Sequence, residues 1–489
     1  MLRSILPRRW PRRWPLWIFL GLALRLVFIV FPRPIDDDTW DYLQLGRNLL
    51  HNGVYGMGSG SGISPTMFRL PAYPIFLAVF EQLFARFWPN NWLNAVFLAQ
   101  TAADLASCLL IAAFARRHLS PRAAEFALAL AALCPFTAVY AAIALTESLS
   151  IFAVALGIYS AGRALAAESA GLRDLPALLL AALASALAAL LRPDGILLFA
   201  SLAAGLFFYT LRARAPRVSS TATSSPIAYT APTSRIRTPL RRALAVTSFF
   251  CCIALAPTAF WTLRNWIDFR VFQPLAPRYI DDPGELPLSG AHRWLRTWSV
   301  EFVSTANVAW NLPGGPIDPV DIPASACDSP QQRAQTVALI AEYNRTNSIS
   351  PDLDRRFAAL ARDRIHAHPF RYYVVFPLER VADMLFRPRT EAFYLEVFWW
   401  QWSQHPAQSA AAILLGLIDL FYVAAAAFAF LRGRVPWRWM LGGYLVLRLA
   451  LLGAIENPEP RYTLECFPIF IVAAAAALAQ SRPIVPPLR

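Results

Sequence analysis

Apolar runs of roughly 20 residues recur along most of the sequence, and this feature constrains the fold more than any other. A run of that length is what an α-helix needs to cross the hydrocarbon core of a bilayer. The composition agrees, since 57% of the residues are hydrophobic and only 16% are charged, whereas about 25% are charged in soluble proteins. The sequence therefore predicts an all-α polytopic membrane protein and excludes a cytosolic enzyme, a disordered chain and a fibrous chain.

The apolar runs predict about ten transmembrane helices. The first run, 14–31, follows a cluster of Arg residues and is not followed by a small-residue cleavage site, so we expect a retained anchor whose amino end is cytoplasmic. The other expected spans are 92–116, 121–141, 146–166, 174–191, 195–211, 243–263, 408–431, 437–455 and 462–480.

The basic residues indicate how these spans are oriented. All of them are Arg, the net charge is +14, and most stand in short clusters between apolar runs. That pattern is typical of cytoplasmic loops and not of a nucleic-acid-binding surface, so we expect membrane lipids and no nucleic acid as partners. With a cytoplasmic start, every short basic cluster falls on the same side and both termini are cytoplasmic. We therefore expect a multi-pass protein of a bacterial inner membrane.

The expected topology leaves two sizeable segments outside the membrane. The first outer loop, 32–91, contains an apolar helix at 75–87, and the larger loop between spans seven and eight contains a similar one at 369–387. Both helices are short for a span and carry charges, so we expect them to lie at the membrane interface. The predicted domains are a membrane domain (1–263), a periplasmic loop domain (264–405) and C-terminal membrane helices (406–489).

Three carboxylates are the candidate catalytic residues. Asp38 and Asp41 stand three apart at the start of an expected helix beyond the first span, so they share one face at the depth of a lipid headgroup. A general base or a metal site for lipid-linked chemistry has to lie there, although helix capping by Asp38 is the alternative. Glu147 lies in the short outer turn between spans three and four, where a carboxylate is costly unless it is solvated, paired or metal-bound. A capping box with Thr146 is its alternative.

Four Arg residues at outer membrane boundaries are candidate ligands for a substrate phosphate: Arg69, Arg192, Arg264 and Arg461. The positive-inside bias makes Arg unusual on the outer side, and its planar fork suits phosphate. For a single side chain, snorkelling to the interface is the alternative.

Charged residues near the middle of spans support a second hypothesis. Asp104, Asp419 and Arg448 lie there, and we expect Asp419 and Arg448, on successive antiparallel spans, to meet as a buried pair. A proton relay is the alternative, and it would fit a transporter or lipid flippase without covalent chemistry. A non-catalytic assembly protein of the envelope is a third hypothesis.

Several short motifs occur in a characteristic order. They are Asp38-x-x-Asp41-Tyr42, residues 48–55, Phe68-Arg69-Leu70-Pro71-Ala72-Tyr73-Pro74, Thr146-Glu147-Ser148, Arg192-Pro193-Asp194-Gly195 and Arg461-Tyr462. In this order the motifs resemble the polytopic lipid-linked sugar transferases of the GT-C class, especially the bacterial relatives of protein O-mannosyltransferases and lipid A aminoarabinose transferases.

The resemblance implies a membrane glycosyltransferase that moves a sugar from a polyprenyl-phosphate donor to a hydroxyl of a lipid, glycan or protein acceptor on the outer face. It implies that Asp38 or Asp41 is the acid/base carboxylate and that Glu147 assists it or binds metal. Arg192, Arg264 and Arg461 would bind phosphate by position. A divalent metal ion is a candidate cofactor, and the sequence leaves open the sugar, the acceptor and the metal.

Overall fold

The structure is a computed structural model that describes residues 13–31, 37–169, 174–212, 239–278 and 282–484. Regular structure in these ranges is helical except for a two-stranded antiparallel hairpin, in which β1 (Gly56–Met57) pairs with β2 (Ser64–Pro65). The predicted all-α fold is therefore confirmed.

Six helical segments of the described chain are long and apolar enough to cross a bilayer, which makes the chain a multi-pass membrane protein. They are α5 (Leu93–His118), α8 (Glu147–Ser169), η2 (Pro193–Gly195) with α10 (Ile196–Arg212), α11 (Pro239–Phe269), α17 (Pro406–Leu431), and η8 (Pro460–Cys466) with α19 (Phe467–Leu478). Shorter helices occupy three more expected spans: α2 (Trp14–Val30), α9 (Leu175–Leu191) and α18 (Arg438–Gly453). Ten membrane crossings remain a prediction.

One expected span differs in form. The run 121–141 was expected to be a single helix, but α6 (Pro121–Ala132) ends before α7 (Pro135–Tyr140) begins. Proline lacks a backbone N–H and its ring crowds the preceding turn, so Pro135 starts a new helix and cannot continue the old one.

Small side chains hold the bundle together. α6 and α9 bury mainly alanine, and α5, α8 and α19 bury several alanines beside larger side chains. α8 packs against both α9 and α5, while α19 packs against α17 and α6. Alanine allows helix backbones to approach closely, which is how membrane helices gain packing contacts without a hydrophobic driving force between them.

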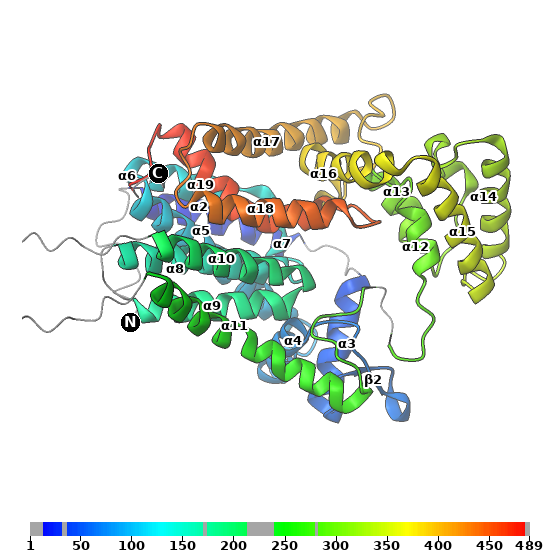
Figure 1. The fold of residues 1–489 in the computed structure, drawn as a ribbon, viewed down its shortest axis with the longest axis horizontal. Helices are drawn as coiled ribbons and strands as arrows, with labels where there is room; N and C mark the ends of the chain where they lie inside the picture. The colour runs from blue at the N-terminus through cyan, green and yellow to red at the C-terminus, as the bar shows by residue number, and fades with distance from the viewer. Residues whose placement is uncertain (1–12, 32–36, 170–173, 213–238, 279–281, 485–489) are drawn as a thin grey trace, which may run out of the picture.

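The polar segments gather at one end of the bundle (Figure 1). The segment between α2 and α5 places α3 (Asp37–Asn52), the hairpin and α4 (Ala72–Phe84) there. α3 lies so close to α4 that a Cβ on Gly46 would stand 2.8 Å from the carbonyl oxygen of Pro74. The expected helix 75–87 is thus α4, which packs on α3, α5 and α9.

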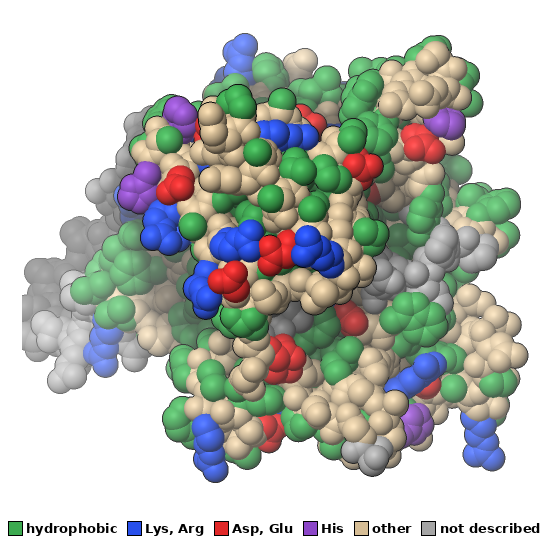
Figure 2. Space-filling view, turned by 90° about the vertical axis from the view of Figure 1, so that its right-hand side faces the viewer, with side chains coloured by type: hydrophobic (Ala, Val, Ile, Leu, Met, Phe, Trp, Pro, Cys, Tyr) green, Lys and Arg blue, Asp and Glu red, His purple; other side chains and the backbone are tan. Residues whose placement is uncertain are grey.

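The segment between α11 and α17 has a hydrophobic core of its own, centred on Trp294, Trp298 and Phe357. It contains α12 (Ser289–Leu295), α13 (Phe302–Ser304), η3 (Thr305–Ala309), η4 (Pro319–Asp321), η5 (Ala324–Ala326), α14 (Pro330–Tyr343) and α15 (Pro351–Ala367). The expected helix 369–387 is formed by η6 (Arg371–Val375) and α16 (Phe376–Phe386), which packs on α17, α18 and η8. η7 (Thr390–Phe393) then leads into α17. Seen from this end, acidic and basic side chains are interspersed with hydrophobic ones, and the surface is hollowed between an upper and a lower part (Figure 2).

Candidate active site

The segment between α2 and α5 brings two predicted acids and one predicted Arg into contact. Asp38 and Asp41 lie one turn apart in α3, and Arg69 reaches both, with Nη2 2.5 Å from Oδ1 of Asp38 and 2.9 Å from Oδ2 of Asp41. The Tyr55 hydroxyl donates to the Arg69 carbonyl at 2.9 Å, and the guanidinium lies over the Tyr42 ring. These three charged side chains are about a quarter exposed, so the group is within reach of a ligand.

A second guanidinium reaches Asp38 from the opposite end of the sequence. Nη2 of Arg461, in η8, lies 2.9 Å from Oδ2 of Asp38, while its Nε lies 2.6 Å from Oε2 of Glu459. The Asp38 carboxylate therefore has one Arg on each oxygen. Burial alone would raise the pKa of Asp38, but Arg461 and Arg69 outweigh burial and lower it to about 2.

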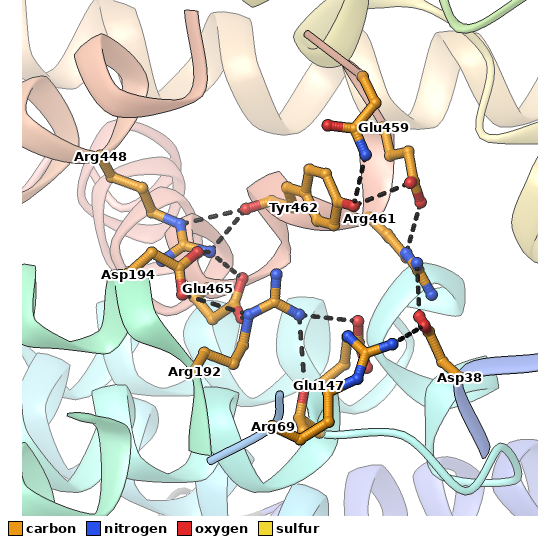
Figure 3. A network of polar contacts seen from close by, with 12 residues as sticks. Asp38, Arg69, Glu147, Arg192, Asp194, Arg448, Glu459, Arg461, Tyr462 and Glu465 are labelled. Carbon is orange, nitrogen blue, oxygen red and sulfur yellow. Dashed lines mark hydrogen bonds and ion pairs between the residues drawn. The ribbon is translucent and has the colours of Figure 1, made fainter. Parts of the chain in front are cut away.

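Glu147 and Arg192 form the centre of a neighbouring group (Figure 3). Glu147 is the first residue of α8, and its Oε1 accepts a hydrogen bond from Nη1 of Arg192 at 3.0 Å. Arg192 follows the end of α9 and also lies 3.4 Å from Glu465. The other oxygen of Glu147 is buried and has no hydrogen-bond partner among the described residues.

Arg448, in α18, is the last member of this second group. Its Nη2 lies 2.6 Å from Oε2 of Glu465 and 2.9 Å from Oδ2 of Asp194, and Asp194 also lies 3.3 Å from Arg192. Arg448 also donates to the Tyr462 carbonyl at 2.7 Å, and the Tyr462 hydroxyl donates to Glu459, the partner of Arg461, so the two groups form one network (Figure 3). The structure thus brings together Asp38, Asp41, Glu147, Arg69, Arg192 and Arg461.

Arg264 is the predicted site residue that the described contacts leave outside this network. Its guanidinium donates to the carbonyl oxygens of Tyr55 and Thr66, each at 2.9 Å, and its Nε lies 2.8 Å from Asp268. Arg264 therefore holds in place the loop that carries Arg69.

The predicted pair of Asp419 and Arg448 is wrong. Asp419 is fully buried and accepts from Nε of Arg389 at 3.1 Å, and Arg389 also donates to the Pro460 carbonyl at 2.6 Å. Arg448 faces Asp194 and Glu465 instead, because η8 and η2 bring those two carboxylates to its end of α18. Asp104 has a partner of its own in Arg25.

Sequence reasoning missed four members of the network: Asp194, Arg448, Glu459 and Glu465. Asp194 was visible in the motif that contains Arg192. Glu459 and Glu465 flank Arg461 at the start of an apolar run, and a carboxylate in such a place needs a cation nearby. Burial raises the pKa of Glu459, which also accepts from the Tyr462 hydroxyl at 2.8 Å.

The donor set of this site is not arranged for a metal ion. Within the described residues, no three His, Cys, Asp or Glu side chains are grouped closely enough to hold one. Asp38, Asp41 and Glu147 each face a guanidinium, which competes with a cation for the same oxygens. The side chains of Asp36 and Asp37 lie outside the described residues.

The fold and the site define an all-α, multi-pass membrane protein with a network of Asp, Glu and Arg side chains at one end of its helical bundle. No protein family and no curated protein sequence matches the chain.

Solved structures do resemble it. One is the archaeal oligosaccharyltransferase AglB from Archaeoglobus fulgidus in complex with an inhibitory peptide and a dolichol-phosphate, with a TM-score of 0.49 and 12% identity over 96% of this chain and 50% of that chain. The apo form of the Archaeoglobus fulgidus oligosaccharyltransferase gives a TM-score of 0.49 and 15% identity, with the same coverage. Another is ArnT from Cupriavidus metallidurans bound to undecaprenyl phosphate, with a TM-score of 0.37 and 14% identity over 95% of this chain and 77% of that chain. The chain spans about half the length of the archaeal proteins that it matches.

Proposed function

We propose that the chain is a membrane glycosyltransferase that moves a sugar from a polyprenyl-phosphate donor to a hydroxyl acceptor at the outer face of the membrane. The observation that carries the proposal is the Asp38 carboxylate held between Arg69 and Arg461. A base next to two phosphate-binding groups, at the end of a lipid-embedded bundle, is what this reaction needs. The structures of AglB and ArnT contain dolichol-phosphate and undecaprenyl phosphate, and the proposal assigns a ligand of that class to this chain on the strength of its own residues.

In the proposed reaction, Arg69 and Arg461 bind the donor phosphate. Guanidinium groups bind phosphate through paired, charge-assisted hydrogen bonds, and both side chains now use those donors on carboxylates. The bond between the anomeric carbon and the phosphate oxygen breaks, the acceptor oxygen bonds to that carbon, and the acceptor proton passes to Asp38. The two Arg residues stabilise the charge that develops on the departing phosphate.

Donor binding also activates the base in this mechanism. Asp38 with a pKa of about 2 is a poor proton acceptor, because two guanidinium groups stabilise its ionised form. When the donor phosphate takes those guanidinium groups, the pKa of Asp38 rises toward the ordinary value. We therefore expect the acid limb of kcat, which reports the donor complex, to lie at a higher pH than the acid limb of kcat/KM, which reports the free enzyme.

We assign supporting roles to the other carboxylates. Asp41 shares Arg69 with Asp38, so it keeps that guanidinium in place when Asp38 takes up a proton. Glu147 positions Arg192 through one of its oxygens.

Donor consumption tests the proposal directly. The full chain, purified into nanodiscs, is supplied with fluorescent polyprenyl-phosphate hexoses and pentoses and with a cell-envelope extract as the source of hydroxyl acceptors, and transfer of the sugar from the lipid is followed. We expect Asp38→Asn to abolish turnover and Asp41→Asn to reduce it strongly. Asp352→Asn is the matched control, because Asp352 is 60% exposed on α15 and its partners Arg355 and Arg356 are exposed too.

The alternative function predicts the opposite order of effects for these substitutions. A transporter or flippase without covalent chemistry would depend on Asp104 and Asp419 inside the bundle and would tolerate Asp38→Asn. Undiminished donor consumption in both Asp38→Asn and Asp41→Asn would remove the proposed base.

The membrane topology is part of the proposal. We propose a bacterial inner-membrane protein with ten spans, cytoplasmic termini, and the loops 32–91 and 264–405 outside. Alkaline phosphatase fused after residue 62 or 345 should be active, and the same enzyme fused after residue 120 or 433 should be inactive. The reverse pattern would place the network on the cytoplasmic face.

A further inference from the structure

The segment between α11 and α17 contains a cavity whose lining includes none of the charged residues of the candidate active site. Its volume is about 340 Å³, and it is lined by residues of α12, α15, η6 and the turn after α12: Ser289, Gly290, Arg293, Arg296, Ala358, Tyr372 and Tyr373. Small-molecule sites span roughly 300–1,000 Å³, so the cavity can hold a ligand of about monosaccharide size.

The charge in this cavity is entirely positive. Arg293 and Arg296 line it, and no Asp or Glu is among the lining residues. Neither side chain forms an ion pair within the described part of the chain, whereas Arg355 and Arg356 of the nearby α15 are both paired with carboxylates. Two unpaired guanidinium groups on one concave surface favour an anion, because the planar fork of Arg matches phosphate and carboxylate oxygens.

Aromatic rings supply the apolar part of the cavity. Tyr372 is buried beneath the Arg296 guanidinium, whose centre lies 5.7 Å from the ring centroid. Tyr373 meets Tyr372 edge to face at 4.8 Å and is 64% exposed. An exposed ring beside a polar cavity can stack on the apolar face of a sugar while its hydroxyl bonds to the sugar's hydroxyls.

The walls of the cavity are fixed by buried contacts. The buried carboxylate of Asp354 accepts from the N–H groups of Gly290 and Ala291, at 3.0 and 2.9 Å, and so holds the start of α12 against α15. The buried Arg380 donates to the carbonyl of Arg296 at 2.5 Å and to that of Ser299 at 2.7 Å. The cavity is therefore formed in advance of ligand binding, which limits the ordering cost of an occupant.

We propose that this cavity binds a sugar that carries a phosphate or a carboxylate, and that it is the subsite for an anionic acceptor of the transferase. Arg293 and Arg296 take the anion, and Tyr373 stacks on the ring of the sugar. The assignment to an acceptor rests on the proposed function, while the anionic-sugar chemistry rests on the lining residues alone.

Direct binding to the full chain tests the inference without any donor lipid. Isothermal titration in nanodiscs of zwitterionic lipid compares glucose 6-phosphate, glucuronic acid, glucose and inorganic phosphate. We expect glucose 6-phosphate and glucuronic acid to bind, glucose to bind at least tenfold more weakly, and inorganic phosphate to bind more weakly than the sugar phosphate. Arg296→Gln and Arg293→Gln should each weaken binding of glucose 6-phosphate about tenfold, and Tyr373→Ala should weaken the sugar phosphate but not inorganic phosphate.

Controls separate this result from misfolding and from the proposed catalysis. Arg345→Gln, which removes an exposed Arg that does not line the cavity, should bind as the unaltered chain does. Asp38→Asn should lose donor turnover and keep binding, so a failure of the proposed function and a failure of this inference give different results. Equal affinity for glucose and glucose 6-phosphate, unchanged binding in Arg296→Gln, or displacement of glucose 6-phosphate by nanodiscs of anionic lipid would overturn the proposal.

Discussion

Removal of Arg461 should destabilise the protein far more than removal of Arg69, although both contact Asp38. Arg461 also pairs with Glu459, whose side chain is only 3% exposed, and its own side chain is 14% exposed. In Arg461→Gln, the Glu459 carboxylate stays buried with only the neutral donors Tyr462 and Trp310. Breaking a buried ion pair in this way costs about 3–5 kcal/mol.

Arg69→Gln should lower the free energy of unfolding much less. The Arg69 side chain is 24% exposed, and its two partners are 27% and 26% exposed, so water can solvate the carboxylates that remain. Asp38 also keeps Arg461. Ion pairs with this much access to solvent contribute about 1 kcal/mol or less, so the difference between the two variants should be roughly 2–4 kcal/mol.

Unfolding in mixed micelles, followed by tryptophan fluorescence as the fraction of denaturing detergent rises, measures this difference. The variant Arg461→Gln/Glu459→Gln is the decisive control, because it removes the buried charge together with its partner and should recover most of the lost stability. Equal destabilisation by Arg69→Gln and Arg461→Gln, or no recovery in the double variant, would refute the reasoning from burial. Donor turnover should be lost in both single variants regardless of stability.

Three further predictions concern the framework of the site. Gly46→Ala should lower the free energy of unfolding by about 1–3 kcal/mol and reduce turnover, because the added Cβ meets the Pro74 carbonyl and moves α3. Gly62 has open space around the position of a Cβ, so thermal unfolding of Gly62→Ala should be unchanged. Burial raises the pKa of Glu391 to about 7, so the contribution of Glu391 to stability is complete below pH 4.5 and is lost as the pH rises through 7. The melting temperature of Glu391→Gln should therefore vary less over that range than the melting temperature of the unaltered chain. An unchanged pH dependence would contradict this account. Glu147→Gln should reduce kcat with little change in melting temperature, because the Gln carbonyl can still accept from Arg192 and Arg192 keeps Asp194 and Glu465 as partners. A large drop in melting temperature would indicate a structural role instead.

The sequence predicted those parts of the fold that depend on local pattern. Apolar runs located the helices because each membrane helix satisfies its own backbone hydrogen bonds and needs only length and apolarity to form. The spacing of Asp38 and Asp41 placed both on one face of α3, and Arg69 meets them within the same loop. These inferences required no knowledge of how distant helices pack.

Partners that come from distant segments were harder to predict. A buried carboxylate such as Asp419 requires a cation, but hydropathy does not show which helix supplies it. The nearest span suggested Arg448, yet the cation comes from Arg389 in the segment before α17, a position that the sequence assigned to the outer loop. Glu465 and Asp194 form ion pairs with Arg448 because the packing of the bundle brings η8 and η2 close to α18. That packing depends on the shapes of side chains in the whole bundle.

The segment between α18 and η8 contacts both the outer domain, by which we mean α12 to α16, and the Arg residue that lies beside the proposed base. Arg380 donates to the carbonyl of Gly453 at 3.1 Å, at the beginning of this segment, and it also fixes the wall of the cavity at Arg296. Further along, Trp310 of the outer domain donates to Glu459 at 3.3 Å, and Glu459 in turn pairs with Arg461. The position of the Arg461 guanidinium beside Asp38 therefore depends on how the outer domain docks. Proton transfer requires the base to lie within hydrogen-bond distance of the acceptor hydroxyl. This segment therefore connects the cavity that we propose for the acceptor with the Asp38 carboxylate that we propose as the base.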